Sequence, residues 1–193
     1  MNSCLPMRLW LAAAGVVLGL PSGGAFADDI ADKAAVCAAC HGDNGVPTDP
    51  KFPIIWGQKA GYLYIELRDM QSGARKNEVM APLIKDFSKD DVLALAQYFE
   101  AKPWPSTGYT ASKEDTDKAN PIEVAGQCTS CHQNGYLGGP NAPRLAGQNV
   151  QYLIKTTQDF KTRERANNPF MSDMLGSFKD EDIQVMSRFL AGQ

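Results

Sequence analysis

The sequence predicts an all-α protein built from two tandem domains of the same design. The pattern Cys-x-x-Cys-His occurs twice, and its histidines, His41 and His132, are 132 − 41 = 91 residues apart. Shifting the sequence against itself by 90 or 91 positions brings much else into register, which is typical of an internal repeat. No stretch shows the sustained polar and apolar alternation that indicates a β-strand.

The N-terminus has the pattern of a secretory signal peptide. Arg8 precedes an almost entirely apolar run over residues 9–20, and residues 25–27 read Ala-Phe-Ala, a small-residue cleavage site. We therefore expect residues 1–27 to be removed and the mature chain to begin at Asp28, in a bacterial periplasm. The apolar run is too short to cross a bilayer, and we expect no transmembrane segment in the mature chain.

Three helices are expected in the first domain, residues 28–101. The alanine-rich segment 31–40 carries the first motif at its end, and a second helix follows over residues 59–71. The last helix begins at Ser88, with Asp91 three residues later as in a capping box. Its apolar residues recur with the helical period and form one buried face: Val92, Leu95, Ala96 and Phe99.

The second domain, residues 119–193, repeats this order. Asn120 followed by Pro121 predicts the N-cap and first position of the helix that leads to the second motif. Helices over residues 149–161 and 180–191 correspond to the other two. Between the domains, residues 102–118 have the prolines, glycine and small polar residues of a linker.

Both motifs predict covalent attachment of a c-type haem. Two thiols one helical turn apart can reach the two vinyl groups on one edge of a porphyrin, and the next residue can bind the iron. A zinc site needs four ligands, and neither motif has a fourth cysteine or histidine nearby. A thioredoxin-like redox site or a disulfide within each motif would use the cysteines but would give the histidines no role. We expect two covalently bound haem c groups, which use both histidines and four of the five cysteines: Cys37, Cys40, His41, Cys128, Cys131 and His132.

Methionine is the expected second ligand to each iron, because no histidine is left and a thioether favours the reduced iron of electron carriers. Met80 and Met171 each follow their motif histidine by 39 residues (80 − 41 and 171 − 132), and we expect them in loops. Met174 lies three residues beyond Met171 and is an alternative ligand in the second domain. A methionine on each iron argues against a di-haem peroxidase, which needs an open position.

Pro53 and Pro143 occupy matching positions after the two motifs, at an offset of 90. A metal-bound imidazole is commonly held through its second nitrogen by a backbone carbonyl. The carbonyls of these two prolines are the candidates for that role, and a proline that only forms a turn is the alternative.

With two such motifs, two trailing methionines and Pro-x-x-x-Gly-Gln in both halves, the sequence resembles di-haem cytochromes c of the cytochrome c4 family. The resemblance implies two class I cytochrome c domains packed about a pseudo-twofold axis, with their haems close together. It implies His41 with Met80 and His132 with Met171 as iron ligands. The thioether cysteines are then Cys37, Cys40, Cys128 and Cys131.

These features predict a periplasmic electron carrier between redox proteins rather than an enzyme. Donors would be a dehydrogenase or a quinol-oxidising complex, and acceptors an oxidase or reductase. The alternative is an electron-transfer subunit of a dehydrogenase complex, since the di-haem subunit of flavocytochrome c sulfide dehydrogenase is similar; its partner would be a flavoprotein. The formal net charge of −3 makes nucleic acid and anionic membrane surfaces poor partners.

Overall fold

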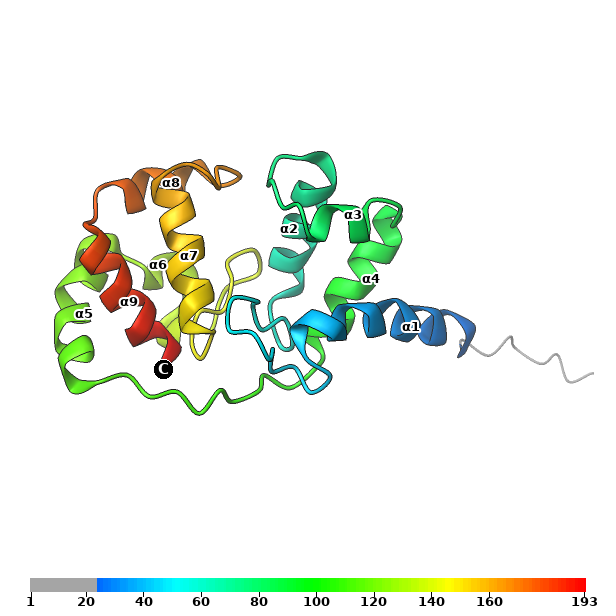
Figure 1. Cartoon of the computed structure of the whole chain (residues 1–193), viewed down its shortest axis with the longest axis horizontal. Coiled ribbons are helices and arrows are strands. Elements are labelled where there is room, and N and C mark those ends of the chain that lie inside the picture. The colour runs from blue at the N-terminus through cyan, green and yellow to red at the C-terminus, as the bar shows by residue number, and fades with distance from the viewer. Residues whose placement is uncertain (1–23) are drawn as a thin grey trace, which may run out of the picture.

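The computed structural model describes residues 24–193, which form nine α-helices and one short 3-10 helix and contain no β-strand (Figure 1). The predicted all-α fold is therefore confirmed. The predicted signal peptide lies outside the described residues, apart from its last four, which begin the first helix. Within residues 24–193, no helix is both long enough and apolar enough to cross a membrane.

Domain one contains four helices. The helix α4 begins after the capping box that the sequence predicted, in which Ser88 Oγ accepts from the Asp91 backbone N–H at 3.1 Å and Asp91 accepts from the Ser88 N–H at 3.0 Å. Its buried face packs against the first two helices. The four elements are α1 (Gly24–His41), α2 (Ala60–Ser72), α3 (Met80–Ile84) and α4 (Lys89–Glu100).

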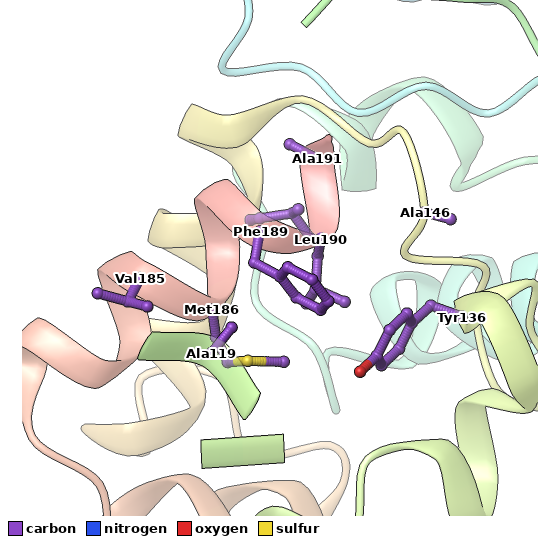
Figure 2. Packing of buried hydrophobic residues seen from close by; sticks show 9 residues of the cluster. Ala119, Tyr136, Ala146, Val185, Met186, Phe189, Leu190 and Ala191 are labelled. Atoms are coloured by element: carbon purple, nitrogen blue, oxygen red, sulfur yellow. The ribbon is translucent and has the colours of Figure 1, made fainter. Parts of the chain in front are cut away.

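Domain two repeats the arrangement around its C-terminal helix, which packs against the helices that precede and follow the second motif. Figure 2 shows part of the core that results: the Tyr136 ring meets the ring of Phe189 edge to face, with centroids 5.7 Å apart. The elements are α5 (Lys113–Gly126), α6 (Thr129–His132), η1 (Asn134–Tyr136), α7 (Val150–Lys161), α8 (Pro169–Gly176) and α9 (Asp180–Ala191).

The predicted start of a helix at Asn120 is wrong. The helix α5 begins after Ser112, whose hydroxyl accepts from the Asp115 N–H at 3.0 Å, so Pro121 lies inside the helix. A Ser-x-x-Asp cap with acidic residues in the first turn is a stronger start signal than Asn-Pro. The helix ends at Gly126, where Gln127 turns left-handed (φ 50°), and the second motif falls on the separate one-turn helix α6.

The interdomain segment also differs from the prediction, because residues 113–118 belong to α5 and only the part before Ser112 is extended. This part runs along one side of both domains (Figure 1). Its Trp104 touches equivalent glycines of the two domains: a Cβ on Gly57 would lie 2.9 Å from Trp104 N, and one on Gly147 3.0 Å from Trp104 Nε1. The Arg144 guanidinium lies 4.6 Å from the indole ring. The segment is therefore a packed strap.

We predict that Gly57→Ala destabilises the protein more than Gly73→Ala does. Both glycines have positive φ (67° and 82°), so each alanine carries a similar backbone strain of about 1–2 kcal/mol. At Gly57 the added Cβ meets backbone atoms of the strap, whereas at Gly73 it meets nothing within 4 Å. Because backbone atoms cannot easily move aside, Gly57→Ala should lower the free energy of unfolding by roughly 1–3 kcal/mol more than Gly73→Ala. Denaturant unfolding of the two holoprotein variants measures the difference. Equal losses would show that the strap is not packed in solution.

Candidate haem sites

The first motif occupies the end of α1. Cys37 and Cys40 are one helical turn apart and both partly buried, and His41 is the last residue of the helix and 5% exposed. Cys37 packs against the apolar core of domain one. Burial raises the pKa of the Cys37 thiol, which keeps the sulfur neutral beside that core.

The second motif is built differently but presents the same groups. Cys128 precedes α6 and packs against the domain-two core, Cys131 is exposed, and His132 ends the helix at 6% exposure. Burial raises the pKa of Cys128 as it does that of Cys37. Among the described residues the four motif cysteines form no disulfide, so all four sulfurs are left for thioether bonds.

Each motif histidine is held by the proline carbonyl that the repeat identified. His41 Nδ1 lies 2.8 Å from Pro53 O, and His132 Nδ1 lies 2.8 Å from Pro143 O. A carbonyl only accepts, so Nδ1 carries the proton in both rings and Nε2 presents its lone pair. Burial lowers the pKa of both histidines, although the hydrogen bond opposes it, and the neutral ring is the form that binds a metal.

The predicted methionines lie on short helices, so their placement in loops is wrong. Met80 is the first residue of α3 and Met171 the third residue of α8. An asparagine side chain three residues earlier holds each backbone N–H: Asn77 Oδ1 is 2.9 Å from Met80 N, and Asn168 Oδ1 is 3.2 Å from Met171 N. Asn168 is the N-cap of α8, and Asn77 makes the same kind of contact from two residues before the N-cap position of α3; both contacts help helix to form where the sequence suggested a loop.

The residues fit a covalently held haem in domain two. Its buried apolar residues form two separate clusters. One carries Cys128 at its edge, and the other carries both Met171 and Met174. A thiol on one apolar cluster, a thioether on another and an imidazole of fixed orientation match the groups that hold a haem c. Met171 and Met174 are both half-buried, so burial does not choose between them.

A buried ion cluster joins the domains: Glu66 lies on α2, Arg75 in the loop after α2, and Arg165 in the loop after α7. Figure 1 shows α2 and α7 facing each other where the two domains meet. Arg165 contacts one oxygen of Glu66 at 2.5 Å, and Arg75 contacts the other at 2.7 Å. Arg165 and Glu66 are 6% and 8% exposed. The sequence reasoning missed this cluster, although Arg75 and Arg165 match at an offset of 90. Thr156 stands at the Glu66 position of domain two, so the cluster contains one such carboxylate instead of two.

A two-domain all-α fold with a Cys-x-x-Cys-His motif in each domain defines a di-haem class I cytochrome c. The chain is 33% identical to cytochrome c4 of Azotobacter vinelandii, over 83% of this chain and 85% of that protein. It is 31% identical to the thiosulfate dehydrogenase electron acceptor of Thiomonas intermedia, over 100% and 94% of the two chains. Reduced recombinant cytochrome c4 from Pseudomonas stutzeri matches with a TM-score of 0.78 at 27% identity, over 86% of this chain and 97% of that one.

The chain belongs to the cytochrome c4 family, which confirms the resemblance seen in the sequence. No protein-family model matches it. As a member of this family it carries two covalently bound haem c groups and transfers electrons.

Proposed function

We propose that this protein is a periplasmic electron carrier in which each haem iron has one histidine and one methionine ligand. The supporting observation is the pair of 2.8 Å contacts that fix His41 and His132 on proline carbonyls in both domains. A ring held in this way aims Nε2 in one direction and loses little entropy when it binds iron. The assigned ligands are His41 with Met80 and His132 with Met171, and the thioethers form at Cys37, Cys40, Cys128 and Cys131.

The haems supply one-electron chemistry, and the polypeptide fixes their ligands and surroundings. Bound to iron, the thioethers of Met80 and Met171 would stabilise the ferrous state, which suits a carrier working at high potential. Neither iron would then keep an open position for a small molecule, and the protein would carry electrons without transforming a substrate.

We propose that residues 28–101 and 119–193 are the two repeated units, as the repeat indicates, and that the end of the segment 102–118 between them, where α5 begins, packs with domain two. Its last residues support domain two: Asp115 accepts two hydrogen bonds from Arg188 of α9, at 2.8 and 3.0 Å. Arg188 correspondingly holds the pKa of Asp115 below its ordinary value. The functional linker is therefore the strap before Ser112.

A dehydrogenase is the proposed electron donor. This is supported by the match to a thiosulfate dehydrogenase electron acceptor, which extends over 100% of the chain. A flavoprotein dehydrogenase is the second candidate, because the di-haem subunit of flavocytochrome c sulfide dehydrogenase has a similar two-domain layout. A permanent subunit would co-purify with its dehydrogenase in fixed ratio, whereas a free carrier would not.

We predict that Met80→Ala and Met171→Ala each remove about half of the weak near-infrared band of the ferric protein. The band reports coordination of iron by methionine, and each variant removes the methionine ligand from one of the two irons. Met174→Ala is the matched control, because it removes a half-buried methionine on the same helix, and it should leave the band intact. If Met174→Ala removed half of the band and Met171→Ala did not, the assignment in domain two would be wrong.

We also predict that a purified thiosulfate dehydrogenase and its substrate reduce this protein by two electrons per molecule. Stopped-flow absorbance of the haem bands measures the amount and the rate. A flavoprotein sulfide dehydrogenase, assayed with sulfide, provides the comparison between the two donor classes. If only the flavoprotein reduced the protein, a flavoprotein dehydrogenase would be the donor instead of a thiosulfate dehydrogenase.

A further inference from the structure

Two buried glutamines cross the domain interface in a reciprocal way. Gln148 Oε1 accepts from the Ile54 N–H at 2.8 Å, and Gln148 Nε2 donates to Ile54 O at 2.9 Å. In the opposite direction, Gln58 Oε1 accepts from the Arg144 N–H at 2.7 Å, and Gln58 Nε2 donates to Arg144 O at 2.9 Å. Both glutamines are 3% exposed. Each amide thus satisfies the backbone of one residue in the other domain.

The repeat relates the two contacts. Gln58 and Gln148 match at an offset of 90, and so do Ile54 and Arg144. The same contact is therefore made in both directions, as at a twofold interface between identical subunits.

The backbone that each glutamine holds is the backbone that holds a motif histidine. The carbonyl of Pro53 and the N–H of Ile54 belong to one planar peptide group. His41 binds the oxygen end of this group and Gln148 binds its N–H end. Because the group is rigid, it cannot rotate at one end without moving the other.

The second site has the same geometry. His132 binds the oxygen of the peptide group between Pro143 and Arg144, and Gln58 binds its N–H. A hydrogen bond to the N–H also polarises the carbonyl and makes it a stronger acceptor. Each glutamine therefore acts on the histidine of the other domain through one peptide group.

We propose that Gln148 is a positioning residue for the haem of domain one and Gln58 for the haem of domain two, so that each domain tunes the other's axial histidine. This inference rests on the ligand assignment of the proposed function. A stronger acceptor at Nδ1 makes the imidazole a better donor to iron, which stabilises the ferric state and lowers the reduction potential. Loss of either glutamine amide raises the potential of the opposite haem.

One further contact makes the two directions unequal. Asn149 Nδ2 donates to Phe52 O at 2.8 Å, just before the peptide group that holds His41. The matching position in domain one is Lys59, which has no amide to donate in this way. The loop of domain one is thus held by two side chains from domain two, and Gln58→Met should have the larger effect.

The test uses two crossed variants of the holoprotein, Gln148→Met and Gln58→Met, each the control for the other. Methionine keeps the length of glutamine and removes its donor and acceptor. NMR of the reduced protein measures exchange of each Nδ1–H, and spectroelectrochemistry measures the two potentials. Gln148→Met should accelerate exchange at His41 about tenfold and leave His132 within about twofold. Gln58→Met should accelerate exchange at His132 by more than about tenfold and leave His41 within about twofold.

The potential of the haem opposite to each variant should rise, while the near-infrared band of methionine coordination stays. An effect confined to the domain that carries the substitution, or equal in both domains, would overturn the inference. If the histidine Nδ1–H signals of the unmutated protein lacked the large shifts caused by a bound haem, the ligand assignment itself would be wrong.

The unmutated protein gives a second measurement in case a variant fails to fold. The Ile54 amide and the His41 Nδ1–H lie at the two ends of one peptide group, so a shared opening should expose both, with protection factors within about tenfold of each other. The Arg144 amide and the His132 Nδ1–H form the matching pair. If the histidine Nδ1–H protons were protected from exchange while the Ile54 and Arg144 amides exchanged rapidly, the inference would be contradicted.

Discussion

The hydrogen bond from each motif histidine to a proline carbonyl is the interaction on which the rest of the structure depends. It joins the helix that ends in the motif to the loop that follows it, in both domains at 2.8 Å. The same loop supplies the Ile54 and Arg144 backbone that the opposite domain binds. Site geometry and domain pairing therefore use the same few residues, and a change in one is expected to reach the other.

Much of the fold follows from local sequence because the signals for it are local. Four helices, α2, α4, α7 and α9, begin within a residue or two of their predicted starts. Apolar periodicity specifies the buried faces of α4 and α9, and a capping box fixes the start of α4. The helix α5 was misplaced because Asn120 and Pro121 imitate a start that Ser112 and Asp115 provide earlier. The methionine helices were missed because each is only a turn or two long and is held at its start by an asparagine side chain, Asn77 or Asn168.

The interface could be predicted only in part. The repeat brought Gln58 into register with Gln148, but a sequence does not show that an amide reaches across to another domain's backbone. The contact between Glu66 and Arg165 joins residues 99 positions apart and has no local pattern. A buried ion pair of this kind adds little net stability compared with apolar packing, but it disfavours any pairing of the domains that would leave a charge alone. With the strap at Trp104, it holds the domains in one arrangement.

We expect the two haem domains to act as one electron-transfer unit. Rapid photoreduction of one haem, followed by absorbance, tests it most directly, because electrons then redistribute between the two sites. We expect a redistribution rate that does not change when the protein is diluted, since transfer occurs inside each molecule. A rate proportional to protein concentration would contradict it, because the electrons would then pass only between molecules.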